Sequence, residues 1–86
     1  MNEKRFAIMK TVIESKIKLN QASEAVEFCN AAEKCDFDIN VFYNRVIIDA
    51  KSIIGIMSMD LNKVLTVQCF GESSEFNKML QKFAIA

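Results

Sequence analysis

The 86-residue sequence has no histidine and no proline, and glycine occurs only at Gly55 and Gly71. The absence of histidine excludes Ser-His-Asp and Cys-His nucleophiles, and with them the commonest general base at neutral pH. No stretch is rich in glycine, proline or serine, so no part of the chain has the composition of a flexible linker. We therefore predict one domain over residues 1–86, with the thin core that a chain of this length can bury.

Neither sign of charge predominates, because 11 lysines and arginines balance 11 aspartates and glutamates. A chain without net charge has no overall field that attracts nucleic acid or anionic lipid. No apolar run approaches the roughly 18 residues of a membrane span, and the N-terminal MNEKRF starts charged rather than with an apolar signal segment. We expect a cytoplasmic protein that binds neither nucleic acid directly nor a membrane.

Cys29, Cys35 and Cys69 form an odd set without a paired CxxC spacing. Without histidine, a zinc site would need all three thiolates and a carboxylate. We interpret these cysteines as small, buried, apolar residues of a protein in a reducing compartment. The sequence therefore predicts no metal ion and no cofactor.

The hydrophobic pattern begins with a strand and a helix. The run FAIMKTVI at residues 6–13 predicts the first strand, and the polar ESKIKLNQ at residues 14–21 predicts a loop. A helix is expected from Ala22, because small apolar residues recur there at helical spacing. This stripe consists of Ala22, Ala25, Val26, Cys29 and Ala32, with Phe28 at its margin.

A hairpin follows the first helix. Alternating apolar residues predict strands at residues 37–43 and 46–50, joined by Asn44 and Arg45 as a two-residue turn. Asparagine tolerates a positive φ at the first turn position. Arg45 would stand where glycine is preferred, at a cost of about 1 kcal/mol.

The C-terminal part contains a fourth strand and a last helix. VLTVQCF at residues 64–70 predicts a strand whose buried face consists of Leu65, Val67 and Cys69. Ser73 or Ser74 can cap the following helix, with Glu75 in its first turn. The apolar stripe of this helix consists of Phe76, Met79, Leu80 and Phe83.

The segment DAKSIIGIMSMDL at residues 49–61 is apolar almost all the way round. Ser52 is placed to cap a helix over residues 53–59 by accepting a hydrogen bond from a first-turn N–H. A helix on a two-layer domain buries only one side, and we assign Ile54, Ser58 and Leu61 to one face. The remaining side chains beside Ser52 predict a protein-docking patch made of Lys51, Ile53, Ile56 and Met57. The alternative is that these residues belong to the core or to a homodimer contact.

Together these elements have the order β-α-β-β-α-β-α. The predicted fold is α+β, a two-layer open-faced sandwich in which a four-stranded antiparallel sheet carries three helices on one face. The other face of the sheet is left to polar residues such as Asp38, Asn40, Thr66 and Gln68.

The segment NRVIIDAKSIIGIMSMDL, and within it Lys51 to Ser58, resembles HPr, the small phosphocarrier of the bacterial phosphoenolpyruvate-dependent sugar phosphotransferase system. The order of elements is similar to that of this family, and the resemblance covers nearly the whole chain. HPr proteins carry a phosphorylatable histidine ahead of the first helix, in a motif that continues with arginine and proline. Counted back without a gap, the resemblance puts Gln21 at the histidine, Ser23 at the arginine and Glu24 at the proline.

These replacements argue against phosphocarrier chemistry, and we expect no catalytic residue. The carboxamide nitrogen of Gln21 has no available lone pair, so it cannot accept phosphate as an imidazole does. Ser23 supplies no charge for a phosphate, and Glu24 would repel one at this helix N-terminus. Ser23 is an alternative phosphate acceptor, but a serine ester lacks the transfer potential of phosphohistidine and needs a dedicated kinase.

A glutamine at the histidine position also occurs in the catabolite-repression homologue of HPr (Crh), which this sequence resembles at Gln21 and Ser52. The resemblance implies phosphorylation of Ser52 by HPr kinase/phosphorylase and binding to a LacI-type transcription regulator. Crh keeps arginine and proline where this chain has Ser23 and Glu24. The part of the regulator contact that uses the arginine region is therefore not implied.

We predict a non-enzymatic regulatory module of the HPr family that docks to protein partners and is switched at Ser52. The alternative is a degenerate structural HPr-like domain or a homodimer with no phosphotransfer role. An enzyme is disfavoured, because the close acid pairs have no partner histidine, glycine-rich loop or metal cluster. Solvated surface acids explain these pairs better: Asp36 with Asp38, and Glu24 with Glu27.

Overall fold

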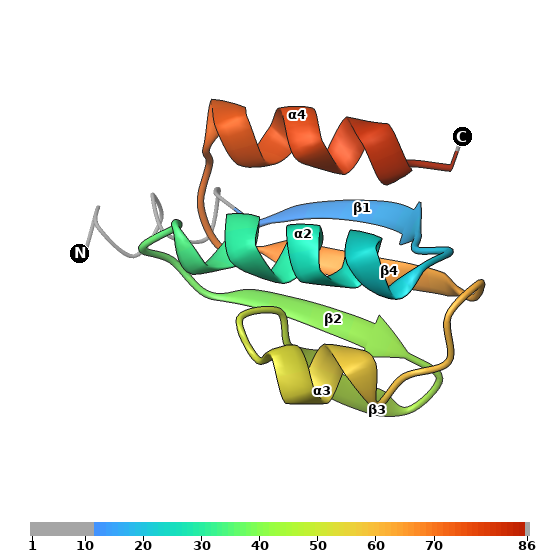
Figure 1. The fold of residues 1–86 in the computed structure, drawn as a ribbon. Coiled ribbons are helices and arrows are strands. Elements are labelled where there is room, and N and C mark those ends of the chain that lie inside the picture. Colours follow the sequence, from blue (N-terminus) through green and yellow to red (C-terminus); the bar gives the residue numbers. More distant parts are fainter. Residues whose placement is uncertain (1–11, 86) are drawn as a thin grey trace.

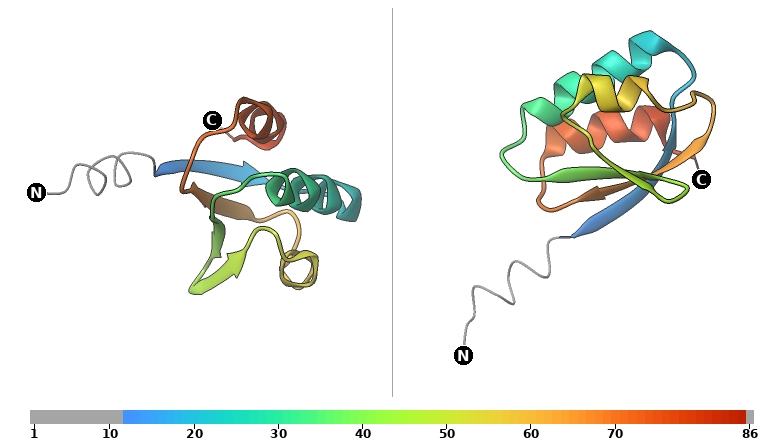
Figure 2. Two further views of the ribbon diagram at one scale, coloured as in Figure 1. Left: turned by 90° about the vertical axis from the view of Figure 1, so that its left-hand side faces the viewer. Right: turned by 90° about the horizontal axis from the view of Figure 1, so that it is seen from below.

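The computed structural model describes residues 12–85 and shows an open-faced sandwich of one sheet and three helices (Figure 1). The sheet has four antiparallel strands in the order β1-β4-β2-β3. All three helices cover one face of it (Figure 2). The predicted fold class and element order are confirmed. The elements are β1 Ile13–Lys18, α2 Ala22–Glu33, β2 Ile39–Tyr43, β3 Val46–Asp49, α3 Ile53–Met57, β4 Val64–Cys69 and α4 Ser74–Phe83.

The first strand differs from its prediction. β1 occupies Ile13–Lys18, where a polar loop was expected. Of the predicted strand at residues 6–13, residues 6–11 lie outside the described residues, and only Ile13 belongs to β1. The prediction failed because the open face of β1 carries charges and only Ile13 and Ile17 of this strand are apolar, so the segment has the composition of a loop.

The core lies between the sheet and the helices. Alternation along the strands directs Ile17, Val41 and Val67 to the helix side, where all three are fully buried. Phe28 of α2 and Phe76 of α4 meet above them, with ring centroids 5.9 Å apart.

Phe28 corrects the predicted stripe of α2, because it is fully buried rather than marginal. Ala22 and Val26 face solvent instead, and Val26 is 42% exposed. The reason is geometric, since Phe28 lies three residues after Ala25 and four before Ala32 and so shares their face. The buried face of α2 consists of Ala25, Phe28, Cys29 and Ala32.

The hairpin and the last helix form as expected. Asn44 takes a positive φ of 55°, and Arg45 is not among the residues with positive φ, so the expected strain at Arg45 does not arise. The strands are shorter than predicted, since β2 begins at Ile39 and β3 ends at Asp49. At α4, Ser73 rather than Ser74 is the N-cap, and its Oγ accepts from the N–H of Phe76 at 3.2 Å.

The open face of the sheet is only partly polar. Asn40 and Gln68, opposite each other across β2 and β4, lie there as predicted, and so does Thr66. The same alternation puts Phe42 and Ile47 on this face, opposite each other in the β2–β3 pair, and Ile47 is 62% exposed. The prediction of a polar face therefore fails at the β2–β3 hairpin, on the β3 side of the sheet.

Candidate functional site

Ser52 caps α3, as the sequence predicts. Its Oγ accepts a hydrogen bond from the N–H of Gly55 at 3.1 Å, and its backbone is extended with φ −96° and ψ 104°. The helix ends at Met57 rather than at residue 59. Ser58 is the C-cap residue, and its N–H bonds back to the carbonyls of Ile54 and Gly55 in a tight last turn.

Gly55 lets α3 lie directly on β3. A Cβ at this position would come within 2.7 Å of the Ile48 Cγ2 and 3.2 Å of the Ser52 Oγ. The first distance is shorter than a carbon–carbon contact allows. The bare backbone at Gly55 therefore positions both the helix and its serine cap.

The exposed apolar surface of α3 consists of Ile53, Ile54 and Met57, which we call the α3 patch. Ile54 is 81% exposed, whereas Ile53 and Met57 are 39% and 44% exposed. Ile56 is fully buried in the core, so its predicted role in docking is wrong for the folded monomer. The assignment of Ile54 to the buried face is also wrong.

These corrections have one cause. Contact with β3 at Gly55 turns the side of α3 that carries Ile56 toward the core. Ile54, two residues before Ile56 and about 200° away around a helix, then faces solvent.

Lys51 is anchored to the backbone that follows α2. Its Nζ donates to the carbonyl of Cys35 at 2.8 Å, and its backbone N–H donates to Asp49 Oδ1 at 2.9 Å. An ammonium group beside the C-terminal end of a helix is favoured by the helix dipole. The position of Lys51 shows that Ser52, its neighbour, lies near the C-terminal end of α2.

The first turn of α2 carries a carboxylate of its own. Gln21 is the N-cap residue, yet its side chain makes no capping hydrogen bond. Instead, Glu24 Oε1 accepts from the backbone N–H of Asn20 at 2.7 Å. A carboxylate in the first turn stabilises the positive end of the helix and repels a second anion. Gln21 and Ser23 are both exposed.

The two predicted sites lie apart. α2 and α3 run antiparallel beside each other (Figures 1 and 2), so Ser52 and Gln21 lie at opposite ends of the helix pair. The twelve residues of α2 span about 18 Å at 1.5 Å per residue. The α3 patch starts beside Ser52 and extends along α3 toward the end of the helix pair where Gln21 lies, because Met57 is the last residue of α3.

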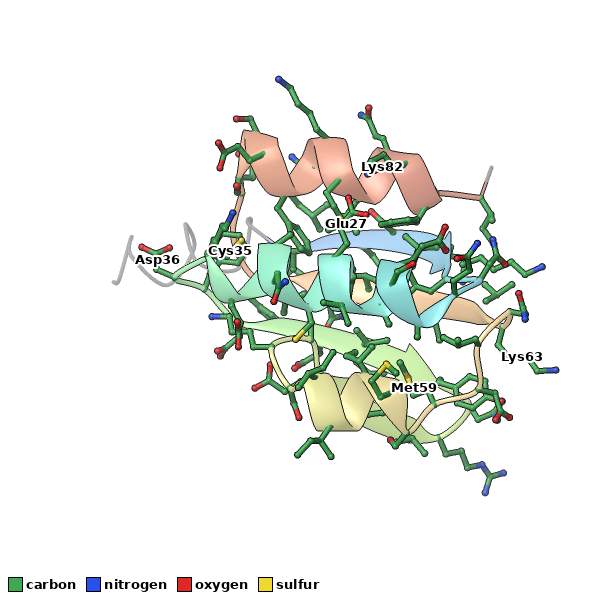
Figure 3. The ribbon with its side chains drawn as sticks, viewed as in Figure 1. Glu27, Cys35, Asp36, Met59, Lys63 and Lys82 are labelled. Atoms are coloured by element: carbon green, nitrogen blue, oxygen red, sulfur yellow. The ribbon has the colours of Figure 1, made fainter. Side chains whose placement is uncertain are left out.

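The cysteines are buried thiols, as predicted. Burial raises the pKa of all three, and it raises that of Cys69 to about 11, with a smaller contribution from Cys35. For Cys35, near the C-terminal end of α2 in Figure 3, a hydrogen bond from Ser73 and the charge of Lys51 oppose the rise in pKa. All three thiols are therefore protonated at neutral pH and are poor nucleophiles.

The helices of residues 12–85 include none that is long and apolar enough to cross a membrane. In the same part of the chain, no three histidine, cysteine or acidic side chains are grouped so that they could hold a metal ion.

A groove of about 790 Å³ between α2 and α4 was not expected from the sequence. It lies on the side of α2 away from α3 (Figure 1). Phe76, Met79 and Ala31 line it together with polar side chains, Ser23 among them. An ion pair between Glu27 and Lys82 joins the two helices beside the groove (Figure 3). The groove contains neither Ser52 nor any residue of the α3 patch.

Comparison with known proteins identifies the family. The family model described as the PTS HPr component phosphorylation site matches residues 9–84. The chain therefore belongs to the HPr family of the phosphotransferase system, although it contains no histidine.

Solved structures of HPr proteins share this fold. HPr-C-His from Thermoanaerobacter tengcongensis is 28% identical with a TM-score of 0.64, and the match covers 83% of this chain and 86% of that one. The phosphocarrier HPr of Bacillus anthracis is 25% identical with a TM-score of 0.61, over 85% of this chain and 93% of the other.

Crh of Bacillus subtilis also shares the fold. It is 22% identical with a TM-score of 0.59, over 81% of this chain and 88% of the other, and its crystal structure shows an intertwined, swapped dimer. The chain is thus HPr-like and similar to Crh.

Proposed function

We propose that this protein is a regulatory member of the HPr family that docks through the α3 patch and is switched by phosphorylation of Ser52. The observation that carries the proposal is the exposure of Ile53, Ile54 and Met57 directly beside a serine that caps their helix. Exposed apolar side chains grouped on one helix are typical of a protein-binding surface. The resemblance to HPr implies that the protein would act in the bacterial cytoplasm.

The N-terminus of α2 argues against a role as phosphocarrier. Gln21 takes the place of the accepting imidazole, and its amide nitrogen is not a nucleophile. The carboxylate of Glu24 already accepts a hydrogen bond at this helix end, where a phosphate would need the same positive potential. Incoming phosphate would therefore meet a like charge and no acceptor.

The helix that Ser52 caps can accommodate a phosphate. The first turn of α3 contains no acidic side chain, so a phosphate on Ser52 meets no like charge on its own helix. It would add about −1.5 to −2 charges at the positive end of α3, which is compatible with the helix. The charge beside the α3 patch would change while the fold stays the same. HPr kinase/phosphorylase and a LacI-type regulator are the partners that the resemblance to Crh suggests.

Phosphorylation is tested by incubating the protein with HPr kinase/phosphorylase and ATP and measuring its mass. We expect one added phosphate on Ser52, none on Ser52→Ala, and wild-type modification of Ser58→Ala, a control at the other end of α3. No modification under conditions that phosphorylate an authentic HPr would refute the switch.

The phosphocarrier alternative is tested with the upstream phosphotransferase and phosphoenolpyruvate. We expect no label on the protein. Label on any residue, including the exposed Ser23, would show that the replacement of histidine by Gln21 has not ended phosphate transfer.

The docking surface is tested with the same kinase. We expect Ile54→Asp to lower the specificity constant for phosphorylation of Ser52 by about tenfold or more, because a charge replaces an apolar contact. Val64→Asp changes a side chain of similar chemistry, 51% exposed on β4, and serves as control. Equal rates for both variants would show that the kinase does not use the α3 patch.

The high exposure of Ile54 also favours a second candidate, a structural domain that self-associates through α3. Light scattering separates the two proposals. A wild-type dimer that becomes monomeric with Met57→Asp would support self-association through the α3 patch.

A further inference from the structure

The two edges of the sheet differ in how they are covered. The outer side of β1 is bridged by the chain after α4, where Ile17 pairs with Ala84 and the N–H of Ile85 donates to the carbonyl of Lys16 at 3.1 Å. Within residues 12–85, β3 pairs with β2 alone. The other side of β3 is the edge of the sheet, as the left-hand view of Figure 2 shows.

The backbone of β3 presents bonding groups at this edge. The N–H of Ala50 donates to the carbonyl of Ile39 at 2.9 Å, so position 50 faces β2. Antiparallel pairing alternates, and positions 46 and 48 therefore face β2 as well. The N–H and C=O of Ile47 point outward, away from the sheet.

β3 is short and ends in the charged Asp49, but it lacks two other features that usually prevent pairing between edge strands. Its sequence, VIID, contains no lysine, and the chain has no proline. Val46 and Ile47 are 50% and 62% exposed. Edge strands with exposed apolar side chains tend to pair with another strand.

The charges beside β3 identify the partner strand. Arg45 precedes the strand and Asp49 ends it, with Ile47 midway between them. In an antiparallel pair of two copies of this segment centred on Ile47, Arg45 of each copy is opposite Asp49 of the other. Opposite charges directly across two strands are stabilising, whereas a parallel pairing would place like charges side by side. Charge complementarity therefore favours a second copy of this chain.

We propose that β3 is a dimerisation edge, on which β3 of a second copy pairs antiparallel about a two-fold axis at Ile47. The two sheets then continue as one. The Ile47 side chains meet on the open face, beside Phe42 of each copy, and two Arg45–Asp49 pairs flank them. This dimer uses neither the α3 patch nor Ser52, and no segment is exchanged between the copies.

Charge reversal gives a sharp test. Arg45→Asp alone places two acidic pairs in the dimer, and Asp49→Arg alone places two basic pairs. When the two variants are mixed, each heterodimer contains two pairs of opposite charge. We expect wild type to sediment as a dimer. Each variant alone should have a dimer dissociation constant at least about tenfold higher, and the equimolar mixture should sediment as a dimer again.

Further variants separate the edge from other surfaces. Ile47→Lys is expected to give a monomer, whereas Val64→Lys, which changes an exposed apolar residue on β4, leaves the dimer intact. Far-UV circular dichroism checks that each variant is folded, since Asp49 also accepts a hydrogen bond from Lys51. A wild-type monomer at all concentrations, or a dimer that withstands Ile47→Lys, would overturn the proposal. A dimer broken by Met57→Asp but not by Ile47→Lys would assign the interface to α3 instead.

Discussion

The position of α3 on the sheet is predicted to depend on Gly55. In a Gly55→Ala variant the new Cβ would approach the Ile48 Cγ2 to 2.7 Å, roughly 0.8 Å inside the usual minimum of about 3.5 Å. Ile48 is β-branched, and this methyl is attached directly to its Cβ, so it can move away only if χ1 leaves its preferred rotamer. Otherwise the helix must move off β3, and the Ser52 cap, 3.2 Å from the same Cβ, is disturbed with it.

The magnitude follows from two opposing effects. Alanine favours a helix over glycine by about 1 kcal/mol, whereas overpacking of this kind costs about 1–3 kcal/mol. The loss of part of the Ser52 cap adds about 0.5 kcal/mol or more to the cost. We expect Gly55→Ala to lower the free energy of unfolding by about 1–2 kcal/mol.

A double-mutant cycle tests the cause by urea denaturation followed by far-UV circular dichroism. Ile48→Ala removes the methyl that collides with the new Cβ. The free energy of unfolding of the double variant should therefore fall by at least about 1 kcal/mol less than the sum of the decreases in the two single variants. Ile54→Ala, at the exposed neighbour in α3, should change stability by less than about 0.5 kcal/mol. Additive losses, or a Gly55→Ala protein as stable as wild type, would show that α3 is not held in this way.

Three further predictions concern stability. Ser73→Ala should lower the free energy of unfolding by about 1 kcal/mol, because the N–H of Phe76 loses its acceptor. Ser74→Ala should lower it clearly less in the same urea titration. Lys82→Met should lower the free energy of unfolding by less than about 1 kcal/mol, and by less still in high salt, since both partners of its ion pair are exposed. A larger decrease that does not depend on salt would contradict this prediction. The pKa of Cys69 is raised to about 11 from an ordinary value near 9, so the unfolded chain releases this proton first as pH rises. Stability should fall by about 2–3 kcal/mol between pH 9 and 11, and a Cys69→Ala variant with the same fall would refute that assignment.

The features that could be predicted from the sequence depend on neighbours along the chain. A serine hydroxyl reaches a backbone N–H three residues later whatever the rest of the fold does, which is why Ser52 was predicted correctly as a cap. Asn44 tolerates a positive φ for an equally local reason. The strong amphipathic stripe of α4 left only one face that could be buried.

Other features were decided only by tertiary packing. β1 combines a charged open face with an inner face that is buried at Ile17, because the helices cover only one face of the sheet (Figure 2) and the neighbouring strand, β4, is distant in the sequence. Phe28 enters the core because it meets Phe76, a residue of another helix. Neither partner is visible from the local pattern.

The α3 patch shows both kinds of control. The run of isoleucine and methionine behind Ser52 already required that some apolar side chains stay exposed, because a short helix on a two-layer fold buries one side only. Which of them are exposed depends on the rotation of α3 about its axis. That rotation is set by the contact between Gly55 and Ile48 of a neighbouring strand, and it buries Ile56 while leaving Ile54 in solvent.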